Sequence, residues 1–160
     1  MKRLWAPWRA KYILNKKGKE CIFCQKSKEK KDRENYILLR GKKCLVVLNI
    51  FPYNNGHLMI VPYRHISSME ELGKEEAAEM MEVLSRMIVL LKEVLHPEGF
   101  NVGINLGDVA GAGIVDHLHL HIVPRWKGDS NFMPVLSETK VISESLKETH
   151  GKLKKKLLEK

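Results

Sequence analysis

The sequence feature that most constrains the fold is a strict alternation of histidine with large aliphatic residues. Residues 116–126 read DHLHLHIVPRW. Successive side chains of a β-strand point to opposite faces, so a strand over 117–123 puts three histidines on one face and three aliphatic residues on the other. These are His117, His119 and His121, and Leu118, Leu120 and Ile122. We expect the aliphatic face to pack on a helix. The histidines then face a cleft or solvent, because buried imidazoles without partners are costly.

Four further apolar runs have the length and the β-branched content of strands. They cover residues 36–39, 44–48, 57–61 and 100–105. The intervening Gly41-Lys42-Lys43 predicts a hairpin between the first two runs. Cys44, at the start of the second run, is expected to be a buried small apolar side chain. The sequence therefore predicts about five strands in a mainly antiparallel sheet.

A long amphipathic helix is predicted from Ser68 to Leu95, where apolar residues recur at intervals of three or four. Ser67 or Ser68 can cap it, and Gly73 can split off a short leading turn. We expect its methionines to fill the core. A basic helix over 142–158 follows the last strand. The order of strands, helix, strands and helix predicts an α+β domain with its helices on one side of the sheet.

Length and composition predict one soluble globular domain of 160 residues, 44% hydrophobic and 29% charged. We divide it into an N-terminal arm (1–35), a catalytic core (36–135) and a basic C-terminal helix (136–160). No apolar run is long enough for a signal peptide or a membrane span, so we expect a cytoplasmic protein without membrane contact.

Lysine-rich stretches near both ends contribute much of the net charge of +9. Residues 147–160 also carry glutamates, which is typical of a solvated helix face. The alternative is a surface that attracts polyanionic small molecules or RNA. The polar stretch 26–34, KSKEKKDRE, is expected to be a mobile loop.

Two chemical interpretations compete for the alternating histidines. In the first, a His-x-His pair binds zinc. In the second, the middle imidazole is a nucleophile that attacks phosphorus, because neutral imidazole is available near pH 7. The preceding segment INLGDVAGAGIVDH favours the second, since Gly107, Gly111 and Gly113 let backbone N–H groups approach phosphate oxygens. A plain pattern of polar residues facing solvent is the remaining alternative, although such strands usually use Thr, Lys or Glu.

The motif HLHLHIV resembles the His-φ-His-φ-His-φ-φ signature of the histidine triad (HIT) superfamily of nucleotidyl hydrolases and transferases, where φ is apolar. Four other segments are similar to its bacterial diadenosine tetraphosphate phosphorylase-like branch. They are LWAPWRAKYI, VVLNIFPYNNGHLMIVPYRH, GFNVGINLG and VPRWKGDSNF. The resemblance covers most of the chain and implies a HIT-like fold.

The resemblance also implies roles for individual residues. His119 would be the nucleophile, His121 and His57 would contact the substrate phosphate, and His117 would hold the nucleophilic ring or its strand. The implied nucleotide contacts are Asn49 at the ribose, Leu48 and Ile50 at the base, Asn105, Gly111, Ala112 and Gly113 at the phosphates, and Trp126 along the cleft. Asn49 as a loop cap and His57 as a structural histidine are alternatives.

The chain departs from the pattern of the family that it resembles just before the triad. Residues 112–115, AGIV, offer no Gln or Ser side chain to bind the phosphate, so backbone amides would substitute or the leaving group differs. Asp116 is acidic beside an anionic substrate. On alternation its carboxylate points away from the histidines, which favours a structural role.

The stretch CIFC at 21–24 has the spacing of a zinc knuckle. The resemblance implies a structural zinc held by Cys21, Cys24, His65 and His117. Unmetallated structural cysteines and redox use are the alternatives, and no thioredoxin-like context surrounds the pair. No organic cofactor is expected.

The implied activity is cleavage of a dinucleoside polyphosphate such as diadenosine tetraphosphate through a nucleotidyl-histidine intermediate. Phosphate or water resolves the intermediate, and a phosphorylase is favoured over a hydrolase. The alternatives are a nucleoside phosphoramidase and a non-catalytic nucleotide- or RNA-binding protein. The intact triad speaks against the non-catalytic protein, because binding alone does not require a nucleophile between two histidines. We expect no nucleic-acid partner. A homodimer is expected, with Trp5, Trp8 and Trp126 as candidate interface, core or cleft residues.

Overall fold

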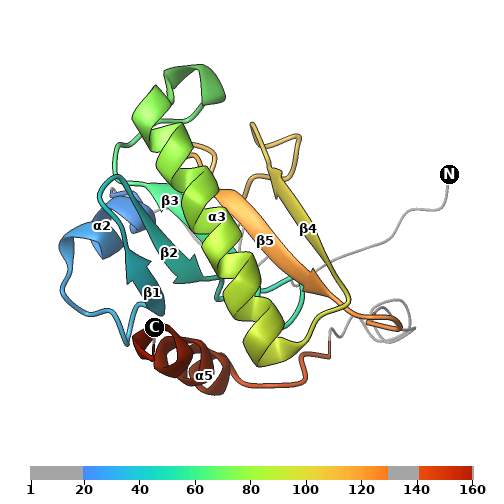
Figure 1. The fold of residues 1–160 in the computed structure, drawn as a ribbon. Helices are drawn as coiled ribbons and strands as arrows, with labels where there is room; N and C mark the ends of the chain where they lie inside the picture. Colours follow the sequence, from blue (N-terminus) through green and yellow to red (C-terminus); the bar gives the residue numbers. More distant parts are fainter. Residues whose placement is uncertain (1–19, 130–140, 160) are drawn as a thin grey trace, which may run out of the picture.

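A five-stranded antiparallel sheet forms the centre of the computed structural model, which describes residues 20–129 and 141–159 (Figure 1). The strand order is β1-β2-β3-β5-β4. The strands are β1 (Ile37–Arg40), β2 (Cys44–Leu48), β3 (Leu58–Pro62), β4 (Gly99–Ile104) and β5 (Leu120–Arg125). The described helices are α2 (Ile22–Lys28), the short 3₁₀ turn η1 (Met69–Glu71), α3 (Lys74–Leu95) and α5 (Leu146–Leu158). The predicted α+β class and its mainly antiparallel sheet are confirmed.

The strand that carries the triad starts later than its alternation predicts. It begins at Leu120, opposite Ile60 of β3 and Ile104 of β4, and neither neighbouring ladder extends further back. His117 and His119 therefore precede the strand, and the Leu118 N–H bonds the Ile66 carbonyl oxygen (2.6 Å). The predicted division of faces still holds: Leu120 and Ile122 belong to the core beneath α3.

The long helix α3 crosses one face of the sheet (Figure 1). Gly73 separates it from η1, as the sequence predicted, and the Gly73 N–H bonds the Glu76 carboxylate (2.8 Å). Met80 and Met87 are buried in the core that α3 forms with the sheet and α5. Gly56 also needs its small size here, because φ is +71° and an added Cβ would lie 2.4 Å from Leu95.

The expectation that helices cover only one side of the sheet is wrong. A second core cluster lies on the opposite face, where Phe23 of α2 packs against Ile37, Leu45, Val47, Met59 and Val61. α2 was not predicted, because a seven-residue helix is too short to show a clear apolar period. The sheet is therefore covered by α3 and α5 on one face and partly by α2 on the other.

Residues 26–34 are held by hydrogen bonds, so the prediction of a mobile loop is also wrong. The Arg40 guanidinium donates to the carbonyl oxygens of Ser27 (2.8 Å) and Glu29 (2.6 Å). The Asn35 amide donates to the Glu29 carboxylate (2.7 Å), and Lys26 Nζ bonds the Asn35 carbonyl oxygen (3.1 Å). Arg40, Asn35 and Lys26 together hold a segment whose composition alone indicates solvent exposure.

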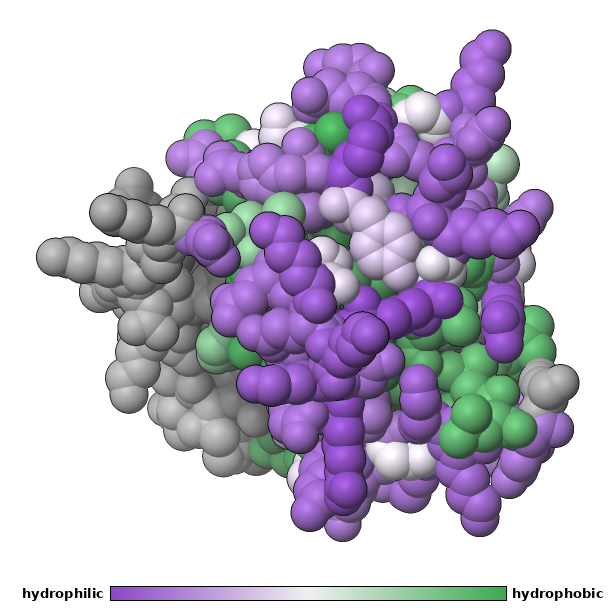
Figure 2. Space-filling model, turned by 90° about the vertical axis from the view of Figure 1, so that its left-hand side faces the viewer, coloured by the Kyte–Doolittle hydropathy of each residue, from purple (hydrophilic) through white to green (hydrophobic). Residues whose placement is uncertain are grey.

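The side of the molecule shown in Figure 2 is mostly hydrophilic. On α5, Lys152 pairs with Glu144 and Lys156 pairs with Glu159. Such mixed pairs fit a solvated helix face, the first of the two interpretations of the lysine-rich tail. Within the described ranges, no helix combines the length and hydrophobicity that a bilayer span requires.

Candidate active site and metal centre

Four histidines lie on the face of the sheet opposite α3, and all are at least nine-tenths buried. They are His57, His117, His119 and His121. The His119 and His121 rings meet edge to face with centroids 4.7 Å apart, and the centroids of the His121 and His57 rings are 5.0 Å apart. The structure therefore brings together all four residues that the sequence placed in the catalytic group.

Hydrogen bonds assign the protons on the His57 and His121 rings. The Tyr53 backbone N–H donates to His57 Nδ1 (3.0 Å), which must therefore carry a lone pair. The proton of neutral His57 then lies on Nε2, which donates to His121 Nδ1 (2.8 Å). The proton of neutral His121 is consequently on Nε2. His57 thus has a structural role, as one alternative held, but it also sets the tautomer of His121.

His121 Nε2 is a donor without an acceptor. It is buried and lacks a hydrogen-bond partner among the described residues. A buried polar group left unsatisfied costs about 1–3 kcal/mol, so an oxygen atom from a ligand would be stabilised at this position. The ring therefore offers a fixed hydrogen-bond donor for a substrate.

The His119 ring has a nitrogen that can accept or attack, in contrast to the donor nitrogen of His121. Its Nδ1 lies 2.8 Å from the His117 carbonyl oxygen, which can only accept, so Nδ1 carries the proton of the neutral ring. Its Nε2 carries the lone pair. The His119 ring packs edge to face against the His121 ring, which carries the unsatisfied donor. A nucleophilic nitrogen and a hydrogen-bond donor on neighbouring rings form the arrangement that group transfer at phosphorus requires.

Burial keeps these rings neutral. It lowers the pKa of His119, partly offset by the bond to the His117 carbonyl oxygen. Burial also lowers the pKa of His121, to about 4, with a further contribution from neighbouring His119. The pKa of His117 is lowered chiefly by burial as well. Neutral rings are needed for a lone pair on one nitrogen and a proton on the other.

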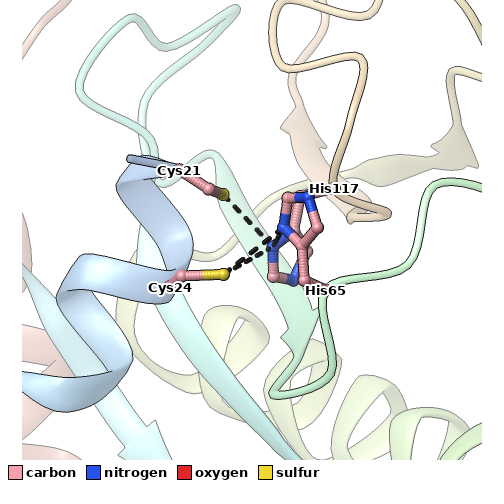
Figure 3. A group of neighbouring side chains, drawn as sticks. All are labelled: Cys21, Cys24, His65 and His117. Carbon is pink, nitrogen blue, oxygen red and sulfur yellow. Dashed lines mark hydrogen bonds between the residues drawn. The ribbon is translucent and has the colours of Figure 1, made fainter. Parts of the chain in front are cut away.

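A second group of side chains, here called the Cys/His cluster, consists of Cys21, Cys24, His65 and His117 (Figure 3). Their four donor atoms lie within 4.8 Å of one another. The two Nδ1 atoms are 3.3 Å apart, and the sulfur–nitrogen distances include 3.3 Å for Cys21–His117 and 3.4 Å for Cys24–His65. Tetrahedral zinc with Zn–N bonds of about 2.0 Å requires nitrogens roughly 3.3 Å apart. The cluster could therefore hold a metal ion.

The proton on His117 supports the same conclusion. Its Nε2 lies 2.9 Å from the Pro62 carbonyl oxygen and therefore carries the proton. Nδ1 is left with the lone pair and points at the two sulfurs and at His65. A histidine that binds a metal through one nitrogen usually donates from the other to a carbonyl or carboxylate oxygen. Of the three triad histidines, only His117 belongs to the Cys/His cluster. A zinc site made by a His-x-His pair would need two of them.

Cys44 lies apart from this cluster. It is 1% exposed in the core beneath α3, as predicted for a small apolar side chain. Burial, together with the nearby Glu79 carboxylate, raises the pKa of its thiol to about 12. The side chain is therefore a protonated thiol in the core.

Phe23 lies between the two groups, and the sequence analysis did not single it out. Its ring centroid is 5.4 Å from that of His117 and 5.3 Å from that of His119. The available signal was an aromatic residue inside the Cys-x-x-Cys spacing. Tyr53 was missed as well, because it holds His57 through a backbone N–H, which every non-proline residue has.

The predicted contacts to base and ribose divide into residues near the site and residues away from it. Leu48 is 1% exposed in the core beneath α3, so its assignment as a base contact is wrong. Ile50 is 39% exposed on the loop between β2 and His57. The Asn49 side chain accepts from the Phe51 N–H (2.9 Å) and lies 3.3 Å from His57 Nδ1. Asn49 therefore caps this loop, and its ribose contact stays a prediction.

The glycine-rich connection forms a folded turn before the triad. Gly111 has φ +89°, and its carbonyl oxygen lies 3.5 Å from the Asn105 amide nitrogen. Ala112 is 9% exposed and Gly113 is exposed. Ile114, next along the chain, packs against the Phe23 core cluster, so the connection reaches the histidine face. Phosphate binding by this connection stays a prediction. Asp116 is exposed at its end.

Trp126 follows the last residue of β5 and lies apart from the triad, so its substrate contact stays a prediction. Its indole N–H donates to the His96 carbonyl oxygen (3.2 Å) beyond the end of α3. Because strands rise about 3.3 Å per residue, Trp126 is roughly 20 Å along the chain from His119. Trp5 and Trp8 lie outside the described residues.

Comparison with known proteins gives one family. A model of the HIT domain matches residues 30–128. The chain is 41% identical to the AP-4-A phosphorylase of Mycobacterium tuberculosis over 93% of its length and 80% of that protein. It is 32% identical to the adenosine 5'-monophosphoramidase hnt1 of Schizosaccharomyces pombe, over 66% of this chain and 74% of that protein. Both relatives are named as enzymes.

A solved structure shares the fold. It is a zinc-bound histidine triad family protein from Mycobacterium smegmatis, with a TM-score of 0.69 and 26% sequence identity. The match covers 88% of this chain and 94% of that one.

Proposed function

This chain belongs to the HIT family, and from that premise we propose that it is a nucleotidyltransferase that cleaves dinucleoside polyphosphates through a nucleotidyl-histidine intermediate. The observation that carries the proposal is a pair of neighbouring rings with complementary nitrogens: His119 has its lone pair on Nε2, and His121 has an unsatisfied donor at Nε2. The relative named AP-4-A phosphorylase supports the substrate class.

In the first step His119 Nε2 attacks the α-phosphorus of the substrate. A phosphorus–nitrogen bond forms, and the bond from phosphorus to the bridging oxygen breaks, so that the rest of the polyphosphate leaves with the bonding electrons. The ring keeps its proton on Nδ1, and the His117 carbonyl oxygen accepts from it, which stabilises the positive charge on the imidazolium. His121 Nε2 donates to a phosphoryl oxygen on which negative charge develops.

In the second step an acceptor attacks the same phosphorus and releases His119. Inorganic phosphate yields a nucleoside diphosphate, whereas water yields a monophosphate. We favour phosphate because the relative at 41% identity is named a phosphorylase. Asn105 and the backbone of Gly111, Ala112 and Gly113 are the proposed phosphate-binding elements, with Asn49 at the ribose and Ile50 at the base.

We propose zinc as the metal of the Cys/His cluster. Two thiolates and two imidazoles form a donor set that zinc favours, and His117 already has the tautomer that a ligand needs. A bound zinc ion would supply a structural cross-link between α2, the segment after β3 and the triad. The zinc-bound family member supports this proposal.

Product identification after incubation with diadenosine tetraphosphate, with and without inorganic phosphate, tests the proposed function. A phosphorylase gives ADP and ATP only when phosphate is present. AMP and ATP without dependence on phosphate would replace the phosphorylase with a hydrolase. Failure of the folded, metal-loaded protein to cleave this substrate would contradict the proposed substrate class.

A nucleoside phosphoramidase is the second candidate, favoured by the relative named adenosine 5'-monophosphoramidase. The same His119 intermediate would form with an amine as leaving group. Adenosine 5'-phosphoramidate in a parallel assay separates the two, because a phosphoramidase has a higher kcat/KM for it than for diadenosine tetraphosphate. A homodimer, a cytoplasmic location and a single domain over 1–160 stay predictions.

A further inference from the structure

Phe23 joins the Cys/His cluster to the nucleophile. It lies on α2 between the ligand candidates Cys21 and Cys24, and its side chain is 2% exposed. Its ring packs edge-on against His117 at an interplanar angle of 76° and against His119 at 53°. Phe23 therefore contacts one member of the Cys/His cluster, His117, and the proposed nucleophile, His119.

Phe23 lies in the N-terminal half of α2, away from the C-terminal end, where Arg40 donates to the carbonyl oxygens of Lys26 and Ser27. The N-terminal cap residue Cys21 makes no side-chain cap bond to the helix, and seven residues are too few for an independently stable helix. Two of the four donor atoms of the Cys/His cluster come from this short segment. A metal held there would therefore fix α2, and with it the Phe23 ring, against the sheet.

His119 needs such a support on one side. Its Nδ1 is anchored to the His117 carbonyl oxygen, which leaves the ring free to rotate about that bond unless packing prevents it. His121 contacts one side of the ring, and Phe23 contacts it as well. His57 and His121 are held differently, through the Tyr53 backbone and through each other.

We propose that Phe23 is a positioning residue through which the Cys/His cluster sets the orientation of the His119 ring. The expected effect of Phe23 on kcat rests on the proposed function. Its effect on the His119 ring stands on geometry alone. Metal binding then determines where the nucleophile points, although the metal lies outside the reaction itself.

The test compares Phe23→Leu and Phe23→Ala with Ile22→Ala, a change at a neighbouring helix residue that is 40% exposed. Leucine keeps an apolar side chain in the core but lacks the flat ring. We expect full metal content in Phe23→Leu, a kcat lowered about 10- to 100-fold and a nearly unchanged KM, because substrate binding is retained while alignment is lost. Ile22→Ala should match the unaltered protein.

Nitrogen-15 NMR of the histidine rings provides the readout that a merely structural role would not change. In the metal-loaded protein His119 should show a single Nδ1–H tautomer. Phe23→Leu should give averaged signals for His119, while His57 and His121 keep their single tautomers, which the Tyr53 N–H sets. Chelation of the metal from the unaltered protein should produce the same change at His119, and Phe23→Leu should add little to it, since both act by one route.

His119 signals and kcat equal to those of the unaltered protein in metal-loaded Phe23→Leu would overturn the proposal. Loss of metal from Phe23→Ala, combined with normal His119 behaviour in Phe23→Leu, would also overturn it and assign Phe23 to the metal site alone. The NMR arm needs no substrate, so it decides the positioning of His119 even if diadenosine tetraphosphate is not cleaved and the proposed function fails.

Discussion

Two groups of histidines share one face of the sheet, and they differ in how the two nitrogens of each ring are used. In the first group, hydrogen bonds run from the Tyr53 backbone through His57 to His121, and they end in a buried donor that has no acceptor among the described residues. In the Cys/His cluster, His117 donates outward to Pro62, and its lone pair converges with three other donor atoms. The same side chain thus provides a proton in one place and a ligand in the other.

His117 belongs to both groups and shows why they are coupled. Its ring lies in the Cys/His cluster, while its backbone carbonyl oxygen fixes the His119 tautomer. A change in the cluster should therefore affect metal content and stability first, whereas a change at His119 or His121 should affect turnover first. Four experiments test this separation.

Replacement of the proposed nucleophile should have the largest effect. We expect His119→Asn to lower kcat by more than about 10⁴-fold, because no lone pair remains to form the intermediate. Metal content and the far-UV spectrum should be unchanged. His96→Asn is the matched control, since His96 is exposed and adopts the left-handed conformation that asparagine tolerates. Activity of His119→Asn within tenfold of normal would exclude the covalent scheme.

Removal of one thiolate should affect the other group. We expect Cys24→Ala to lose the bound metal and about 10 °C in Tm, since a ligand saturated about 1,000-fold contributes about 4 kcal/mol. Elemental analysis and a thermal melt measure both. Cys44→Ala is the control, because Cys44 lies in the core away from the cluster. Equal metal content in the two variants would show that the cluster is not the metal site.

Loss of the unsatisfied donor should reduce turnover without loss of metal. We expect His121→Phe to lower kcat by about 10²- to 10³-fold, as when one hydrogen bond to a developing charge is removed. Steady-state kinetics and metal content are measured on the same preparation. A kcat near that of the unaltered protein would mean that His121 does not contact the reacting phosphate.

The pH dependence of stability should show the smallest effect. Burial lowers the pKa of His121 from 6.5 to about 4 in the folded protein. Between these two pH values the unfolded chain binds more protons at His121 than the folded protein does. The contribution of neutral His121 to the free energy of unfolding is therefore fully present above pH 6.5 and is lost as the pH falls to about 4. It amounts to about 3 kcal/mol. Urea denaturation measures the free energy of unfolding at pH 7 and at pH 4. The decrease between the two pH values should be about 3 kcal/mol smaller in His121→Phe than in the unaltered protein. Equal decreases in the two proteins would contradict the burial argument.

Local pattern predicted the regular elements well where they are long or bounded by glycine. The apolar period and Gly73 located α3 and η1, and β2 has the predicted bounds. β5 was placed too early because alternation continues through His117 and His119, while the ladders with β3 and β4 stop at Leu120. Leu48 was misassigned because its position next to Asn49 says nothing about which face of the sheet it occupies.

The sequence alone determined that the triad histidines share one face and that the aliphatic residues between them enter the core, since a strand alternates its side chains. It also provided, through a family resemblance, the residues of a metal site. Only the tertiary structure decided which histidine holds a proton on which nitrogen. For His119 the deciding atom is local, the carbonyl oxygen of His117. For His117 and His121 the deciding atoms lie far along the chain, at Pro62 and at Tyr53 through His57, and folding brings them to the triad.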